Sequence, residues 1–217
     1  MLRIEWLGHA GFRVSDEKVL YIDPFQIDGG EKADIILITH PHYDHCSIDD
    51  LKKIVKLGTI IVAPIDCQSK VAAGKLHYAE FKNVAPGSSM SVYGCPIHAV
   101  PAYNIGKAFH NRHDEWVGYV FRMSGKAFYH AGDTDFINDM VGLAGMNVDF
   151  AMLPVGGTYT MNAREAAQAV TMIRPKVAIP MHYGSIVGSP EDAEVFMSSV
   201  AHSKVEVMKK NVPLEIK

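Results

Sequence analysis

Residues 35–45 of this chain read IILITHPHYDH, an apolar run followed by four potential metal ligands within six positions. The apolar run predicts a strand that is covered on both faces. Its four donors are His40, His42, Asp44 and His45. Imidazole and carboxylate suit Zn²⁺, and also Fe or Mn, whereas the lack of a thiolate argues against a soft-metal site. Four donors exceed what one tetrahedral ion usually takes from a single loop, so a two-metal centre is favoured over a polar turn with incidental histidines.

Length and composition limit the class of protein. The 217 residues carry a formal charge of −3, and the lack of a broad basic face argues against nucleic-acid binding. Three cysteines and no signal peptide indicate a cytoplasmic location. No apolar run approaches the roughly 18 residues that span a bilayer. We therefore expect a cytoplasmic protein with a small-molecule substrate and no membrane segment, and the pattern leaves a homo-oligomer open.

Strand-like and helix-like segments follow one another along the whole chain. Strands are expected at 2–7, 12–14, 19–22, 35–39, 59–63, 76–81, 90–93, 96–101, 116–123, 127–130, 148–153, 177–180, 204–208 and 212–216, with the segments from 76 to 103 forming a meander. Helices are expected to start after Ser47, Asn162 and Ser189, which can cap them. Two β-rich halves, roughly 1–110 and 111–217, predict one α/β domain with paired sheets inside and helices outside.

Potential ligands recur where apolar strands end. Asp23 follows one predicted strand, Asp133 lies just beyond another, and His182 follows a third. The carboxyl ends of neighbouring strands share an edge, where sites commonly form. We therefore expect these residues to meet the histidine-rich loop at one edge of the sheets.

Four motifs in this order resemble those of the metallo-β-lactamase-fold hydrolase superfamily: D-P at 23–24, T-H-x-H-x-D-H at 39–45, G-D-T-D at 132–135 and P-M-H-Y-G at 180–184. The likeness covers essentially the entire chain. It is closest to the branch of small metal-dependent hydrolases that includes the ascorbate-phosphate lactonases, and the chain is more distantly similar to ribonuclease Z and to the phospholipase D that acts on N-acyl ethanolamine lipids. The resemblance implies a four-layer αββα sandwich of two mixed sheets with two divalent metal ions between them.

The resemblance also implies a role for individual residues. It assigns His40 and His42 to the first ion. It assigns Asp44, His45 and His182 to the second ion, and Asp133 would bridge both. Asp23 would accept a hydrogen bond from a ligand histidine and fix its tautomer. His130 is expected either to be structural or to support a ligand in the same way. Zn²⁺ is the first expectation, with Mn²⁺ or Fe as alternatives.

One position departs from the family pattern. The family usually completes the first metal site with a histidine where this chain has Asn104, and an amide is a poor Zn²⁺ ligand beside imidazole. The site could be completed by Asn104 or a water, or it could be completed by His110, with His113 as the next candidate. The third alternative is that the position stays unfilled. The same loop carries Lys107 and Arg112, which either hold an anionic substrate or belong to a solvated loop.

The expected activity is hydrolysis. Two metal ions lower the pKa of bound water from about 15.7 to about 7, so a bridging hydroxide would attack an ester, lactone or phosphoester bond of a small, anionic substrate. Asp44 and His9 are the expected catalytic residues; the branch places His9 facing the pocket, although it could instead serve a tight turn. The alternatives are a phosphodiesterase or ribonuclease, a diiron reductase, which typically has glutamate where His42 stands, and a metal-binding protein with little turnover.

Overall fold

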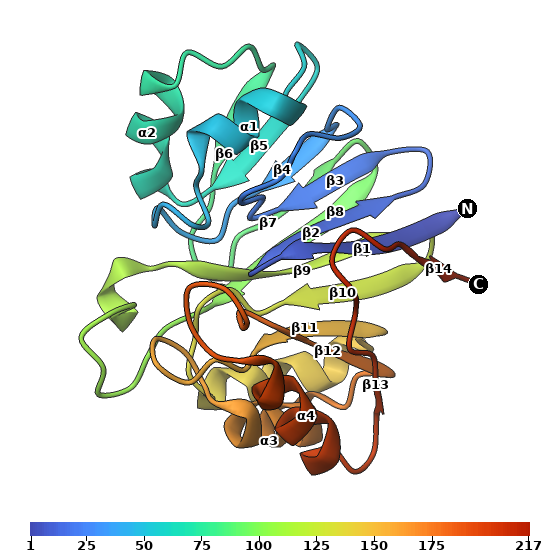
Figure 1. The fold of residues 1–217 in the computed structure, drawn as a ribbon. Coiled ribbons are helices and arrows are strands. Elements are labelled where there is room, and N and C mark those ends of the chain that lie inside the picture. Colours follow the sequence, from blue (N-terminus) through green and yellow to red (C-terminus); the bar gives the residue numbers. More distant parts are fainter.

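Two seven-stranded sheets pack face to face in the computed structural model, which describes residues 1–217 (Figure 1). The first sheet contains β1 (Leu2–Gly8), β2 (Gly11–Ser15), β3 (Val19–Ile22), β4 (Ile35–Leu37), β5 (Ile60–Ala63), β6 (Glu80–Asn83) and β14 (Leu214–Ile216). The second sheet contains β7 (Ser89–Val92), β8 (Cys95–Pro101), β9 (Val117–Met123), β10 (Lys126–His130), β11 (Phe150–Pro154), β12 (Val177–Met181) and β13 (Lys204–Val205). The strand orders are β14-β1-β2-β3-β4-β5-β6 and β13-β12-β11-β10-β9-β8-β7.

Both sheets are mixed, and each has a parallel half. In the first sheet β3 to β6 are parallel, and in the second β10 to β13 are parallel. The registers align the strand ends, because Ile22 pairs with Leu37 and Leu37 with Val62. The loops that follow β3 and β4 therefore leave the first sheet at one level.

Helices cover the outer faces and complete four layers (Figure 1). The helices α1 (Ile48–Ile54) and α2 (Gln68–Ala73) lie on the first sheet, whereas α3 (Ala163–Ile173) and α4 (Pro190–Ser199) lie on the second. Asn162 and Glu165 form the expected capping box at the start of α3, and Pro190 begins α4 as expected. The predicted αββα architecture is confirmed. None of the helices combines the length and the hydrophobicity that crossing a bilayer requires.

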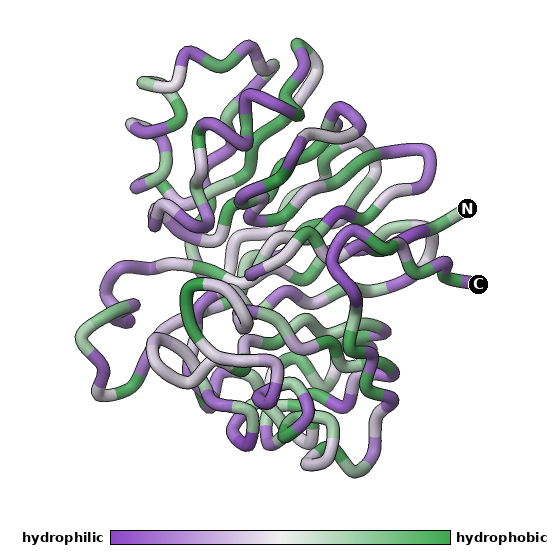
Figure 2. Tube along the Cα trace, in the orientation of Figure 1, coloured by the Kyte–Doolittle hydropathy of each residue, from purple (hydrophilic) through white to green (hydrophobic).

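The inner faces of the sheets form the main core. One cluster of 47 buried residues joins Phe12 and Ile22 of the first sheet to Tyr119 and Phe121 of the second. A smaller cluster of 14 residues lies beneath α1 and α2, so the parallel strands of the first sheet are apolar on both faces. The hydropathy colouring shows hydrophobic stretches along these strands (Figure 2). This packing gives the loops at the strand ends a rigid base.

Direct bonds tie the two sheets together at the edge where the ligand-rich loops emerge. The backbone N–H of His182 donates to the carbonyl of His9 over 2.9 Å. The buried hydroxyl of Tyr119 donates to the carbonyl of Ile38 over 2.8 Å. The first bond joins the loop after β12 to the turn after β1, and the second joins the loop after β4 to β9.

Three details differ from the sequence-based expectation. The meander over 76–103 was wrong: β6 pairs parallel to β5 in the first sheet, while β7 and β8 form a hairpin in the second. The short helix α2, which was not expected, returns the chain so that β6 can run parallel to β5. Helix α1 does begin after Ser47, but the expected side-chain cap is absent. The Ser47 hydroxyl donates instead to the Asp50 carboxylate, which accepts the backbone N–H groups of Gln26 and Ile27.

Candidate metal centre

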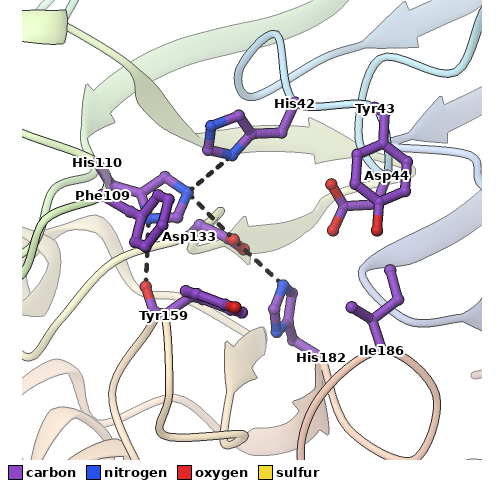
Figure 3. A pocket seen from close by; sticks show the side chains of 9 residues that line it. All are labelled: His42, Tyr43, Asp44, Phe109, His110, Asp133, Tyr159, His182 and Ile186. Carbon is purple, nitrogen blue, oxygen red and sulfur yellow. Dashed lines mark hydrogen bonds and ion pairs between the residues drawn. The ribbon is translucent and has the colours of Figure 1, made fainter.

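Asp133 lies among four imidazole rings that come from three separate parts of the chain. Figure 3 shows two of these rings, those of His110 and His182, on either side of Asp133. Its Oδ2 is 3.2 Å from Nε2 of His182, 3.4 Å from Nε2 of His110 and 4.0 Å from Nε2 of His40. Its Oδ1 is 3.4 Å from Nε2 of His45. The structure thus brings together the segments that the sequence placed at the ends of separate strands.

Three histidines on one side of Asp133 form a first group of potential ligands. Nδ1 of His42 lies 3.0 Å from Nε2 of His40 and 3.1 Å from Nε2 of His110. The ligand atoms of these three residues all lie within 4.8 Å of one another. Three imidazole nitrogens around one point form a suitable site for Zn²⁺ or a related ion.

A second group lies on the other side of Asp133. Its members are His9, Asp44, His45 and His182, whose ligand atoms also lie within 4.8 Å of one another. His9 Nε2 is 2.9 Å from Asp44 Oδ2, and the ring of His9 packs 4.0 Å from that of His182. His9 therefore contacts a potential ligand directly, although it lines a different cavity from Asp133.

Asn104 supports the loop that carries His110. Its amide nitrogen donates to the carbonyls of Phe109 and Tyr159 over 3.0 and 2.6 Å, and it lies 3.2 Å from Nδ1 of His110. Its Oδ1 is buried and has no hydrogen-bond partner. His113 lies on an exposed turn outside both groups. The geometry therefore favours His110 over Asn104 and His113 as the third nitrogen of the first group.

Asp23 fixes the orientation of His45. Its Oδ2 is 2.8 Å from Nδ1 of His45, and its two oxygens also accept the backbone N–H and the hydroxyl of Thr39 over 2.8 and 2.6 Å. All three residues are buried. With the Nδ1 proton directed to Asp23, His45 turns its Nε2 toward Asp133, which is the orientation typical of a histidine whose Nε2 binds metal once it is deprotonated.

His130 has a structural place beside the cluster. Its Nε2 lies 2.8 Å from the carbonyl of Ala10, and its Nδ1 accepts the backbone N–H of Gly132 over 3.2 Å. These bonds join the turn between β1 and β2 to the loop that carries Asp133. His130 belongs to neither ligand group, so it holds the backbone rather than a ligand side chain.

Burial and charge set the protonation of the cluster. Burial lowers the pKa of His110 to about 4 and lowers the pKa of His40 well below its usual range. Burial opposes ionisation of Asp44, but the hydrogen bond from His9 and the positive charges of His45 and His9 together outweigh it and lower the pKa of Asp44 to about 2. Burial likewise opposes the charged form of His45, yet the nearby carboxylates raise its pKa well above its usual range. At neutral pH the first group therefore consists of neutral imidazoles, the form that binds metal.

Several buried ligand atoms lack a partner within the protein. Nε2 of His45, Oδ1 of Asp133 and Nε2 of His182 are fully buried and take part in no hydrogen bond. Buried polar groups are nearly always paired, and each exception requires an explanation. Nitrogen and oxygen donors that converge without partners fit divalent Zn, Mn or Fe ions. The residues present therefore fit a metal centre.

A cavity of about 240 Å³ opens over this centre (Figure 3). Beyond the ligand groups, its wall consists of Tyr43, Phe109, Tyr159 and Ile186. The aromatic wall was not expected from the sequence, because Tyr43 and Phe109 lie in polar loops and Tyr159 and Ile186 lie far along the chain. The only available signal was the position of Tyr43 and Phe109 beside potential ligands.

Lys107 and Arg112 do not line this cavity. The ammonium group of Lys107 is bonded to the carboxylate of Asp135 and donates to a backbone carbonyl. The guanidinium group of Arg112 lies 3.6 Å from Asp139 and 5.0 Å from the ring centre of Tyr103. Both cations have carboxylate partners, so the structure gives no support for the expectation that they hold an anionic substrate.

Two packed mixed sheets with a histidine- and aspartate-rich cluster at one edge define a hydrolase of the metallo-β-lactamase fold. Residues 3–182 match the family model described as the beta-lactamase superfamily domain. A UPF0173 metal-dependent hydrolase of Pyrococcus abyssi is 35% identical over 238 residues, covering 100% of both chains. The chain therefore belongs to the beta-lactamase superfamily and, within it, to the UPF0173 metal-dependent hydrolases.

Solved structures agree with this assignment. The crystal structure of a Parabacteroides distasonis protein named as a metal-dependent hydrolase superposes with a TM-score of 0.81 at 32% identity, covering 95% of this chain and 92% of that one. Igni18, a metallo hydrolase of Ignicoccus hospitalis, shares the fold with a TM-score of 0.79 at 24% identity, over 100% and 99% of the two chains. The closer likeness to the ascorbate-phosphate lactonases stays a prediction.

Proposed function

We propose that this metal-dependent hydrolase uses two divalent ions, most simply Zn²⁺, to cleave the ester or lactone bond of a small substrate. The ligands would be His40, His42 and His110 for one ion, Asp44, His45 and His182 for the other, and Asp133 for both. Bound there, the ions would lower the pKa of a water molecule to about 7 and polarise the bond to be cleaved. The observation that carries the proposal is the position of Asp133 between the two groups of imidazoles.

The protein's own residues would hold this centre in one geometry. Asp23 keeps His45 in a single tautomer, and Asn104 holds the loop of His110. His9 is a positioning residue in this proposal, because its Nε2 lies 2.9 Å from Asp44 and it is absent from the wall of the cavity above Asp133. Ligands held by such hydrogen bonds keep the arrangement that catalysis needs.

A small ester or lactone suits the cavity better than a nucleic acid. The volume of about 240 Å³ is below the range of about 300–1,000 Å³ that is typical for drug-sized ligands. Its wall contains no lysine or arginine, whereas binding of a nucleic acid depends on contacts between cations and phosphates. The small volume therefore supports a compact substrate, and a wall without lysine or arginine favours a carbonyl over a phosphodiester.

The test is a panel of lactones, carboxylic esters and phosphodiesters assayed with zinc-loaded protein. We expect turnover of a lactone or ester, and its loss in Asp133→Asn, which keeps the shape of the side chain but removes its charge. The matched control is Asp139→Asn, at a carboxylate outside the ligand groups that pairs with Arg112. Turnover of phosphodiesters alone would overturn the choice of bond. Two bound ions without turnover on the whole panel would favour a metal-binding protein instead.

A further inference from the structure

The wall of the cavity over the metal centre has two apolar sides. Phe109 and Tyr159 pack edge to face on one side, with ring centres 5.0 Å apart, and lie next to His110 (Figure 3). Tyr43 and Ile186 lie on the opposite side, beyond Asp44 and His182 in the same view. The groups that would hold the metal lie between these two sides.

Three of these four side chains are exposed although they are largely apolar. The exposed fraction is 48% for Phe109, 62% for Tyr43 and 40% for Ile186. Single exposed apolar residues are common, but several around one concavity mark a ligand-binding site. Water would leave these surfaces when an apolar group entered, which is the main favourable term for such binding.

Charges near the cavity are already paired within the protein. Apart from two tyrosine hydroxyls, the only ionisable groups in the wall are the histidines and carboxylates of the candidate metal centre. Of the lysines near the cavity, Lys107 is bonded to Asp135, and Lys70, whose charge acts on His42, donates to the backbone carbonyl of Pro41. A charged group on the substrate would therefore meet rings and methyl groups instead of a counterion, at a cost in desolvation.

We propose that Phe109, Tyr159, Tyr43 and Ile186 form an apolar subsite that binds an uncharged alkyl or aryl substituent next to the bond that is cleaved. This inference rests on the proposed function and names its substrate class: apolar esters or lactones, in place of the anionic substrate that the sequence suggested. The cavity has room for roughly eight groups of about 30 Å³, the volume share of one water. After the carbonyl is placed, a substituent of about six carbons fills it.

Two series of compounds test the subsite. The first is γ-butyrolactone carrying substituents from methyl to octyl, assayed for kcat/KM with zinc-loaded protein. We expect an increase of about threefold to fourfold per methylene, the ratio for complete burial of a CH₂ group, which ends near six carbons. The second series is the n-alkyl carboxylates from acetate to octanoate, whose Kd is measured by calorimetry and requires no turnover. The same dependence on chain length is expected in both series.

Variants assign the effect to the wall. Phe109→Ser and Ile186→Ser should each reduce the dependence on chain length in both series. Leu57→Ser is the matched control, since Leu57 is 78% exposed and precedes β5 at the edge opposite the metal centre. This variant should keep the full dependence.

The two series separate failure of the subsite from failure of the proposed function. A chain-length effect on carboxylate binding without any lactone turnover would support the subsite and overturn the hydrolysis of lactones. Lactone turnover that does not change with chain length, or that is faster for lactones with a carboxylate substituent, would overturn the subsite and leave the proposed function standing. An equal loss of dependence in Leu57→Ser would also overturn it.

Discussion

Replacing His110 with alanine tests which residue completes the first metal site. His110 contributes one of three nitrogens that lie within 4.8 Å of one another. Structural zinc sites with about four ligands gain about 10–16 kcal/mol from the metal, so one ligand is worth about 3 kcal/mol. Because about 1.4 kcal/mol corresponds to a factor of ten, His110→Ala should weaken binding of the first ion about 100-fold.

Asn104→Ala should have a smaller effect. Its amide holds the His110 loop through the carbonyls of Phe109 and Tyr159, and loss of a supporting hydrogen bond at a metal site typically costs about tenfold or somewhat more. His113→Ala is the matched control, since this histidine lies on the same loop but is exposed, and its removal should leave affinity unchanged.

The assay is competition between metal-free protein and a chromogenic chelator, with circular dichroism to show that each variant is folded. The expected order of zinc affinity is parent equal to His113→Ala, then Asn104→Ala, then His110→Ala. If Asn104→Ala weakens the first site as much as His110→Ala does, or more, then Asn104 rather than His110 is the ligand. Unchanged affinity in His110→Ala would refute the assignment altogether.

Three further predictions concern the support, the metal and the pH dependence of the site. Asp23→Asn should weaken binding of the second ion by about 10- to 100-fold, because His45 loses its anionic partner, and an unchanged titration would contradict that role. Removing metal with a chelator should lower the melting temperature by about 8–16 °C in calorimetry, since ligand at a thousand times its Kd adds about 4 kcal/mol; an unchanged transition would argue against a resident metal. The pKa of His110 is about 4 in the folded protein and 6.5 in the unfolded chain, so the unfolded state binds the proton first as the pH falls. The metal-free protein should therefore lose about 3 kcal/mol of stability between pH 6.5 and pH 4. Urea unfolding should show that the free energy of unfolding falls with decreasing pH in the parent and falls less steeply in His110→Gln. Equal pH dependence in the two proteins would refute the burial argument.

Much of the architecture could be predicted because the decisive signals are local. The apolar run before Thr39 marks a strand covered on both faces, and the fold confirms it with β4. Asn162 followed three positions later by Glu165 marks the start of α3, because capping bonds involve residues close in sequence. Potential ligands at the ends of parallel strands meet because strand register brings those ends to one edge.

The remaining features depend on contacts between distant segments. The preference for His110 over Asn104 rests on the bond from Asn104 to Tyr159, which lies 55 positions beyond it. The partner of Lys107 is Asp135, 28 positions away. The spacing of residues along the chain carries no information about such pairs, so neither the third ligand nor the neutralised loop charges could be derived from it.

The most direct test of the two-metal account is a crystal structure of the zinc-loaded protein with anomalous diffraction measured at the zinc edge. The account predicts two anomalous peaks on either side of Asp133, one bound by His40, His42 and His110 and the other by the second ligand group, which includes His182. A single peak, or ions whose ligands exclude Asp133 and His182, would contradict it.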